Sequence, residues 1–361
     1  MPARIGPYNT GVKPNRAVLC LWTAALVATA CASSGRSVAL RQLTSAPCDT
    51  ARRAEAAVDW FGPDSPEERL RLSAWCESVG PAALRAPART LPIPDIARSG
   101  VVVVTWNVHE GGGDIQRLMT DLRRRSGDGS GIAPAPALVL LVQEAFRSGE
   151  AVPVQVPADV RAPRAIHPRR PAFSDIVKVA EQEDMWLAYV PSMRNGRDSR
   201  EDRGCAILST LPLSNVAGIE LPWISQRRVA VIATINARQG NTPWQLRAVS
   251  VHLDNRRGRS RQAAALARVA SAHDAGGIPI IIGGDLNTWM GPGEDAVRQI
   301  DAVAARVREC GDAPTFRFRR HLDYLFTTLP ADVRRGCQIL PDVFGSDHHP
   351  TVLRLFAPDL L

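Results

Sequence analysis

Val-Val-Val-Val-Thr-Trp-Asn, at residues 101–107, is the stretch that decides the fold. Its four valines and the Thr-Trp pair form a continuous apolar, β-branched run, which is typical of a strand buried on both faces of a sheet. Asn107 ends this run with a polar side chain. A polar group at the end of a buried strand lies where the chain leaves the core, so a ligand can reach it.

The same pattern recurs further along the chain, with segments of helical periodicity such as 115–125 and 261–272 between the runs. The later junctions are Gln143-Glu144, His252, Asp285-Leu286-Asn287, Leu322-Asp323-Tyr324 and Ser346-Asp347-His348-His349-Pro350. Parallel strands bring their terminal polar groups to one edge of a sheet, where α/β enzymes bind ligands. With Asn107 there are six such junctions, which loop chemistry alone does not explain.

In this order, the fragments resemble the endonuclease/exonuclease/phosphatase superfamily. This superfamily has the fold of deoxyribonuclease I, AP endonucleases, bacterial neutral sphingomyelinases and inositol polyphosphate 5-phosphatases. The resemblance covers roughly Val101 to Phe356 and implies an α/β (α+β) fold, a four-layer sandwich of two face-to-face mixed β-sheets flanked by helices. The matching pieces are Thr105-Trp106-Asn107, Gln143-Glu144, Arg203-Gly204-Cys205-Ala206-Ile207-Leu208-Ser209, Val251-His252-Leu253, Gly284-Asp285-Leu286-Asn287, Leu322-Asp323-Tyr324 and Ser346-Asp347-His348.

The resemblance implies a metal site made of oxygen ligands. Glu144 would be the main ligand, Asn107 would lie beside it on the metal or the phosphate, and Asp347 would be a second metal or water contact. Hard oxygen ligands suit Mg²⁺ (or Mn²⁺), which needs only one or two protein carboxylates. The alternative for Glu144 is a solvated carboxylate after a strand.

The resemblance also implies catalytic roles for five side chains. Asp285 would orient or deprotonate the attacking water, and Asn287 would donate to a phosphate oxygen. His348, oriented by Asp323, would stabilise the pentacovalent phosphorane or protonate the leaving group. His252 would be a second phosphate-facing histidine. Two alternatives stay open: a simple turn at residues 284–287, and a core role for His252.

Two positions depart from AP endonucleases. His109 stands where those enzymes carry an acid, and His252 falls where they have a tyrosine-containing loop. Both differences favour the deoxyribonuclease and sphingomyelinase side of the superfamily. The glycines at 111–113 either let backbone N–H groups approach a phosphate or form a flexible loop.

The first thirty residues have the pattern of an export signal. Basic residues precede an apolar run at 17–30, and small residues lead into Cys31, as in a bacterial lipobox. We therefore expect a signal peptide at 1–30 and lipidation of Cys31, a linker and helical region at 31–98, and a catalytic domain at 99–361. A plain secretory leader is the alternative. Either reading places the protein outside the cytoplasm, in the bacterial envelope or secreted.

Export permits disulfide bonds. Cys48 and Cys76 bracket two helical patterns, at Asp49 to about Phe61 and from Ser65 onward, which predicts a short N-terminal helical hairpin closed by a Cys48–Cys76 bond. Cys310–Cys337 is a second proposed pair. Cys205 would then stay free in a core strand. The Pro-rich residues 80–98 indicate an extended linker or a surface strap.

Charge narrows the substrate class less than the motifs do. A net charge of +8 with almost exclusively arginine fits an anionic substrate or codon bias. The basic, Pro-rich segment 147–170 would track a nucleic-acid backbone, lie on anionic lipid, or form an inert loop. The tryptophans are scattered, so no exposed aromatic hairpin of the kind that inserts into membranes is expected.

The favoured function is therefore metal-dependent hydrolysis of a phosphodiester outside the cytoplasm, with nuclease activity ahead of a sphingomyelinase-like phospholipid or small-molecule phosphoesterase. Two further hypotheses are a non-catalytic envelope binding lipoprotein, and a lipoprotein whose N-terminal hairpin recruits an envelope partner. The expected protein is a monomer held at the membrane by its lipid anchor, with a phosphodiester, nucleic acid or phospholipid as partner.

Overall fold

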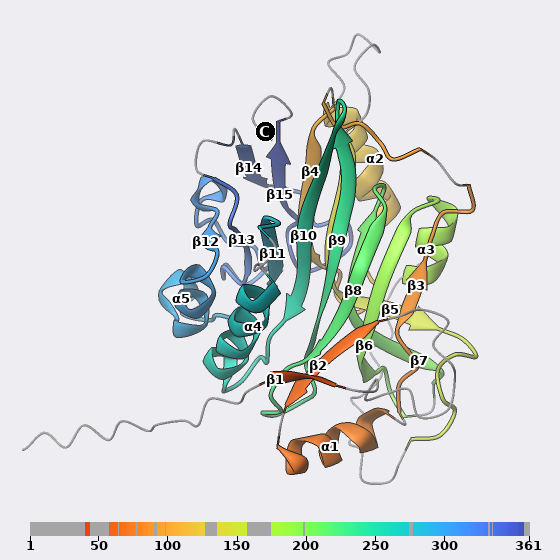
Figure 1. The fold of residues 1–361 in the computed structure, drawn as a ribbon. Coiled ribbons are helices and arrows are strands. Elements are labelled where there is room, and N and C mark those ends of the chain that lie inside the picture. Colours follow the sequence, from red (N-terminus) through yellow and green to blue (C-terminus); the bar gives the residue numbers. More distant parts are fainter. Residues whose placement is uncertain are drawn as a thin grey trace, which may run out of the picture. The chain divides into compact units, whose positions relative to one another are not determined.

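Two mixed β-sheets pack face to face, with helices on both outer faces (Figure 1). The computed structural model describes residues 40–43, 58–63, 65–76, 78–89, 92–97, 99–126, 136–156, 175–197, 199–273, 277–330, 333 and 335–356. The described residues all fall within the compact unit Ser37–Leu361. The predicted α/β sandwich is confirmed.

The first sheet has eight strands in the described part of the chain. Their order across the sheet is β1 (Leu40–Leu43), β2 (Asp59–Pro63), β8 (Leu213–Glu220), β9 (Val229–Gln239), β10 (Thr242–His252), β11 (Ile280–Asp285), β13 (Asp323–Thr327) and β12 (Ala305–Arg306). Helices α1 (Pro66–Cys76), α4 (Arg259–His273) and α5 (Asp295–Asp301) follow β2, β10 and β11 in the chain. Short 3₁₀ turns lie at Gly291–Gly293 and Arg308–Cys310.

The second sheet has seven described strands. Their order is β14 (Arg335–Ile339), β15 (Thr351–Leu355), β4 (Val101–Asn107), β5 (Ala137–Ser148), β7 (Glu201–Ser209), β6 (Trp186–Arg194) and β3 (Ala83–Arg85). Helix α2 (Ile115–Ser126) follows β4 in the chain, and helix α3 (Ile176–Gln182) precedes β6.

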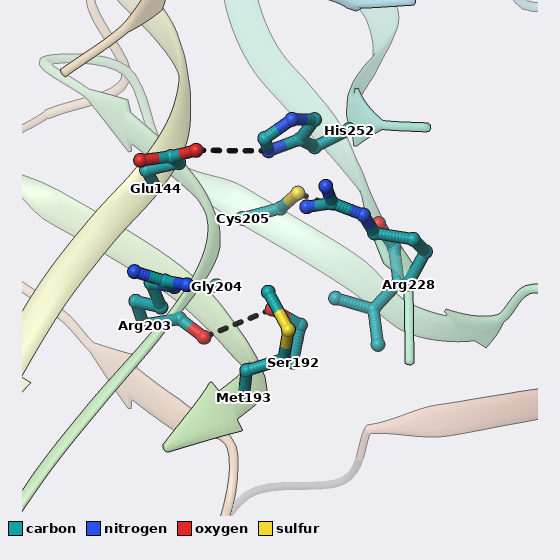
Figure 2. Close-up of a pocket in the computed structure, with 9 residues that line it drawn as sticks. Glu144, Ser192, Met193, Arg203, Gly204, Cys205, Arg228 and His252 are labelled. Carbon is teal, nitrogen blue, oxygen red and sulfur yellow. Dashed lines mark hydrogen bonds and ion pairs between the residues drawn. The ribbon is translucent and has the colours of Figure 1, made fainter. Parts of the chain in front are cut away.

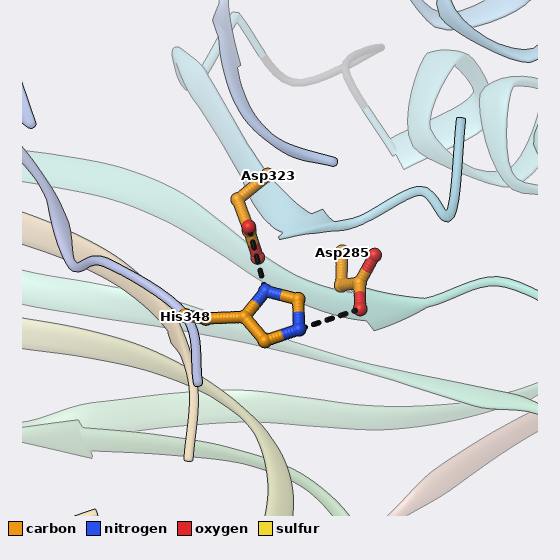
Figure 3. A group of neighbouring side chains, drawn as sticks. All are labelled: Asp285, Asp323 and His348. Atoms are coloured by element: carbon orange, nitrogen blue, oxygen red, sulfur yellow. Dashed lines mark hydrogen bonds and ion pairs between the residues drawn. The ribbon is translucent and has the colours of Figure 1, made fainter. Parts of the chain in front are cut away.

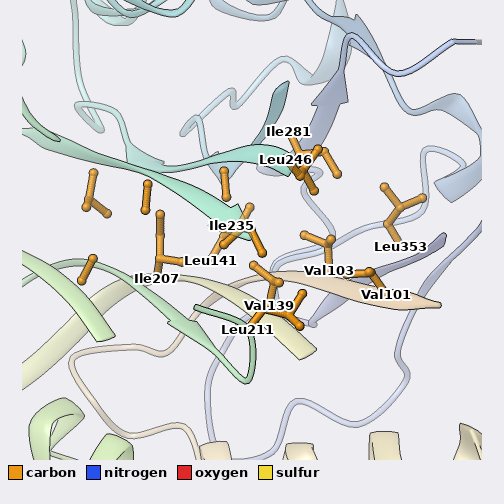
Figure 4. Close-up of a cluster of buried hydrophobic side chains, with 14 of the residues drawn as sticks. Val101, Val103, Val139, Leu141, Ile207, Leu211, Ile235, Leu246, Ile281 and Leu353 are labelled. Atoms are coloured by element: carbon orange, nitrogen blue, oxygen red, sulfur yellow. The ribbon is translucent and has the colours of Figure 1, made fainter. Parts of the chain in front are cut away.

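Alternate side chains of each strand build separate apolar layers. Val103 and Val139 of the second sheet meet Leu246 and Ile281 of the first in a core between the sheets (Figure 4). The intervening valines of β4, such as Val104, face outward and pack with α2. The apolar side chains of α2 recur at helical spacing, so one face of the helix is buried. This explains why residues 101–104 are apolar without interruption.

The N-terminal segment differs from the predicted helical hairpin. The prediction of a helix from Asp49 to about Phe61 was wrong at its C-terminal end. Asp59–Pro63 is instead strand β2, which pairs in parallel with β8. Trp60 is buried and lies on Gly218, where a Cβ atom would come within 2.6 Å of the indole ring. Burial of this ring against the sheet outweighs helical periodicity. The helix predicted from Ser65 is confirmed as α1, with Ser65 Oγ accepting from the Glu68 amide.

The Pro-rich residues before the first central strand are extended, as expected. They contribute β3 to the edge of the second sheet and a bridge between Asp95 and Arg238 of β9 in the first. Ile96 is buried in the core between the sheets. Segments from before residue 99 therefore take part in both sheets.

The cysteine predictions have mixed outcomes. The Cys310–Cys337 disulfide is confirmed, and Cys205 is free and buried in β7. Cys31, Cys48 and the side chain of Cys76 lie outside the described residues, as does most of the basic segment, at 157–174. In the described part of the chain, no helix has the length and apolar character needed to cross a membrane.

Removing the Cys310–Cys337 bond by a double Cys→Ser substitution should lower the free energy of unfolding by about 3–4 kcal/mol, because the bond closes a loop across 27 positions. Urea denaturation measures this change. Denaturation of both proteins with dithiothreitol is the control, since the difference should vanish once the bond is reduced in the wild type. Equal urea midpoints for the wild type and the double variant would contradict the prediction.

Candidate active site

The polar residues predicted from the sequence meet where strands of the two sheets end. Asn107 at the end of β4 is in register with Gln143 of β5. In the other sheet His252 ends β10 opposite Asp285 of β11. Because both of these strand pairs are parallel, their polar ends lie at the same edge. Asp285 is in turn opposite Asp323, the first residue of β13.

A hydrogen bond joins the two sheets at this edge. Asn107 Nδ2 donates to Asp285 Oδ2 over 3.0 Å, and both side chains are buried. The amide of His109 donates to Asn107 Oδ1, which fixes the orientation of the Asn107 amide group. Asp285 Oδ1 accepts from the Asn287 amide at 2.8 Å. The Asp285 carboxylate is therefore held by both of its oxygens.

Glu144 is aimed at the same point by an irregularity in its strand. The register of β5 on β7 shifts between Val142 and Ala145, and Glu144 has a φ of 54°. A bulge of this kind redirects one side chain at the cost of a left-handed backbone. The Glu110 amide donates to Glu144 Oε2, while Oε1 lies 3.9 Å from His252 Nδ1. The Glu144 side chain keeps 20% of its surface exposed.

His252 is held as a neutral ring. Asn287 Nδ2 lies 3.0 Å from His252 Nε2 and also donates to the Leu253 carbonyl. Burial, together with the nearby Arg228 guanidinium, lowers the pKa of His252 well below its usual value. The Asn287 side chain was expected to donate to phosphate. In this structure its amide nitrogen is engaged inside the protein and positions His252.

His348 forms a carboxylate–imidazole pair with Asp323, as predicted (Figure 3). Nδ1 lies 2.8 Å from Asp323 Oδ2, and Nε2 lies 3.8 Å from Asp285 Oδ2. Burial opposes protonation, but the carboxylates of Asp323, Asp285 and Asp347 together more than offset it and raise the pKa of His348 to about 10. Burial and the proximity of Asp323 raise the pKa of Asp285 to about 7. His348 is therefore a cation at neutral pH.

Asp347 lies beside this pair but is already paired. Its Oδ1 is 3.1 Å from His109 Nδ1, and its Oδ2 is 3.6 Å from Arg317 Nε. Burial raises the pKa of Asp347, but the neighbouring His109, His348 and Arg317 together outweigh it and keep that pKa below its usual value. The second metal contact expected at Asp347 therefore competes with two basic partners.

Sequence reasoning missed a buried charged layer beneath Glu144. Arg203 and Arg228 line a small pocket with Glu144 and His252 (Figure 2). Arg203 forms an ion pair with Glu110. Burial and the neighbouring Arg228 charge lower the pKa of Arg203 to about 9. Arg203 lay within a matching fragment, but no spacing in the sequence indicates that Glu110 or Arg228 would join it.

Two sets of residues are candidate ligands for a divalent cation. Asp285, Asp323 and His348 bring ligand atoms within 4.8 Å of one another. His348 Nδ1 already contacts Asp323, so a cation bound here would have to displace this contact. Glu144 offers a partly exposed carboxylate with Asn107 nearby. This hard-oxygen set fits Mg²⁺, which keeps several of its waters.

Comparison with solved structures finds several similar chains. The human nocturnin catalytic domain is 17% identical, covering 75% of this chain and 99% of its own, with a TM-score of 0.48. A protein of Beutenbergia cavernae named endonuclease/exonuclease/phosphatase is 19% identical over 72% of each chain, with a TM-score of 0.50. The mannosyl-6-phosphatase of Bacteroides thetaiotaomicron is 14% identical, covering 71% and 99%, with a TM-score of 0.47. A search of curated proteins gives no match.

The family model described as "Endonuclease/Exonuclease/phosphatase family" matches residues 104–348, which include every residue of the site described above. The members of this family are generally phosphoesterase or nuclease-type hydrolases, and they commonly use divalent metals. The match spans strands of both sheets and the polar residues at their ends that form the site. The chain therefore belongs to the endonuclease/exonuclease/phosphatase family.

Proposed function

We propose that the protein hydrolyses a phosphodiester with the help of a divalent metal, outside the cytoplasm, and that a nucleic acid is the leading substrate class. The observation that carries this proposal is the meeting of Glu144, Asp285 and His348 around the Asn107–Asp285 hydrogen bond. These side chains would supply an oxygen ligand, a proton acceptor and a cation around one point. Hydrolysis of a phosphodiester needs these three groups together.

Glu144 and Asn107 would hold the cation. When bound there, Mg²⁺ or Mn²⁺ would neutralise phosphoryl oxygens and the leaving alkoxide. The Glu110 amide keeps the Glu144 carboxylate in place before the metal arrives. Asn107 has a second task, because the same amide group orients Asp285.

Asp285 is the proposed acceptor of the proton from the attacking water. Hydrogen bonds from Asn107 and from the Asn287 amide fix its carboxylate. Its buried setting and its pKa of about 7 match the requirement that a general base titrate near the working pH.

His348 supplies positive charge on the other side of Asp285. Asp323 holds Nδ1, so the Nε2–H of the imidazolium is directed towards the reacting group. It would stabilise negative charge on the phosphoryl oxygens and give a proton to the leaving oxygen. Neutral His252 accepts or donates one hydrogen bond without adding charge next to Asp285.

Export and anchoring remain part of the proposal. The Cys310–Cys337 bond favours an oxidising compartment, where disulfides persist. We propose that Cys31 carries the lipid and that the mature protein is a monomer at the envelope membrane. Incorporation of a labelled fatty acid, absent in Cys31→Ser, tests the anchor; equal incorporation would refute it.

A substrate panel with the mature protein tests the reaction. Plasmid DNA, RNA, sphingomyelin and inositol phosphates are offered with Mg²⁺ or Mn²⁺ and with EDTA. We expect metal-dependent cleavage of a nucleic acid, and a loss of about 10²–10⁴-fold in kcat for Asp285→Asn and His348→Asn. Leu70→Ala, at an exposed position of α1, is the control and should retain full activity.

Three results of this panel would contradict the proposal. They are turnover that persists in EDTA, full activity in Asp285→Asn, and binding of a substrate with no turnover by any metal-loaded form. Turnover of sphingomyelin or inositol phosphates alone would keep the metal-dependent reaction and overturn the substrate class.

The protonation of His348 can be measured directly. In EDTA-treated protein, NMR of labelled histidine should show His348 still protonated at pH 8, because its pKa is about 10. In Asp323→Asn the pKa should fall to between about 7 and 9, since an opposite charge has been removed. A His348 signal that titrates near 6.5 in the wild type would contradict the Asp323–His348 pair.

A further inference from the structure

Three large apolar side chains are exposed beside the catalytic centre. Trp289 is 40% exposed, Met290 84% and Phe318 60%. Trp289 and Met290 follow Asn287 in the chain, and Phe318 lies in the tight turn Phe316–Arg320 before β13. The tryptophans are scattered in the sequence, but the fold brings Trp289 beside Phe316 of this turn.

The turn that carries Phe318 is fixed against the site. Phe316 bridges both Arg320 and His348, and the Arg317 amide donates to the Asp347 carbonyl. The Phe316 ring lies 4.7 Å from the His348 ring, 5.2 Å from Phe318 and 6.2 Å from Trp289. The exposed Phe318 ring is therefore one ring away from the catalytic imidazole.

Exposed guanidinium groups alternate with these rings. Arg317, Arg319 and Arg320 flank Phe318 in the turn and are exposed. The Arg317 guanidinium lies 4.6 Å from the Phe318 ring centroid, and Arg320 Nη1 donates to the Trp289 carbonyl. Arg256 and Arg257, also exposed, follow His252 on another loop at this edge.

We propose that this aromatic–basic turn, residues 316–320 with Trp289, binds single-stranded nucleic acid and that Phe318 stacks on a base next to the scissile phosphate. This inference rests on the proposed phosphodiesterase function and names its substrate. A polynucleotide alternates flat bases with phosphates, and the rim alternates rings with guanidinium groups in the same way. A membrane would instead favour apolar side chains grouped at the tip, with cations set back from it. Here arginines flank Phe318 on both sides within the tip.

The test measures binding in EDTA, so it does not depend on turnover. The probes are a fluorescein-labelled DNA strand of about 12 nucleotides, the same strand with abasic sites, its duplex, and phosphatidylglycerol vesicles. Phe318→Ala should weaken binding of the intact strand about 5- to 100-fold, and Phe318→Trp should restore it. On the abasic strand, wild type and Phe318→Ala should agree within about twofold.

Two further variants separate stacking from charge. Arg319→Ala should reduce the slope of log affinity against log salt by about 0.7, the value for one phosphate contact on a single strand. Leu70→Ala removes a 74% exposed apolar side chain that is distant in the sequence from residues 316–320. This variant should bind the strand like the wild type.

The proposal is overturned if Phe318→Ala binds the intact strand like the wild type, or if it loses as much on the abasic strand. It is also overturned if the wild type prefers the duplex, or if Phe318→Ala loses only vesicle binding. A protein that binds the strand through Phe318 yet cleaves nothing with Mg²⁺ would refute the proposed reaction while keeping this binding surface.

Discussion

The hydrogen bond between Asn107 and Asp285 is the contact on which the site depends. It links the last residue of β4 in one sheet to the last residue of β11 in the other. Val101 and Val103 of β4 and Ile281 of β11 fix the separation of the sheets through the core between them. A change in packing there would move Asn107 relative to Asp285, and a shift of about 1 Å is enough to impair catalysis. The packing of the apolar core therefore sets the geometry of the polar edge.

Unfavourable backbone geometry is concentrated at this edge. His109, Glu110, Glu144 and Asn287 all have φ between 50° and 54°, a region that costs residues other than glycine of order 1 kcal/mol or more. Each backbone strain coincides with a contact that orders the site: the amides of His109, Glu110 and Asn287 bind Asn107, Glu144 and Asp285. These hydrogen bonds offset the local strain and hold the side chains of Asn107, Glu144 and Asp285 in place.

Much of this arrangement could be predicted from the sequence, because buried strands and their polar ends leave a local signal. The run at 101–107, the junctions at Glu144, His252 and Asp285, and the Asp323–His348 pair all follow from that signal and the family resemblance. Residues 59–61 could not be assigned, because their pairing with β8 depends on contacts of Trp60 with distant Gly218. The aromatic–basic turn with Trp289 was missed for the same reason, because Trp289 and Phe316 meet only through the fold.

A double-mutant cycle in the hydrolysis reaction tests the central claim most directly, that Asn107 and Asp285 act as one unit across the two sheets. kcat is measured for Asn107→Ala, Asp285→Asn and the combined variant at saturating Mg²⁺, so that weaker cation binding without Asn107 does not lower it. If Asn107 works by orienting Asp285, the combined variant should be within about tenfold of Asp285→Asn alone, because groups that act together are not additive. Losses that multiply would show that the two side chains act independently and would contradict the account.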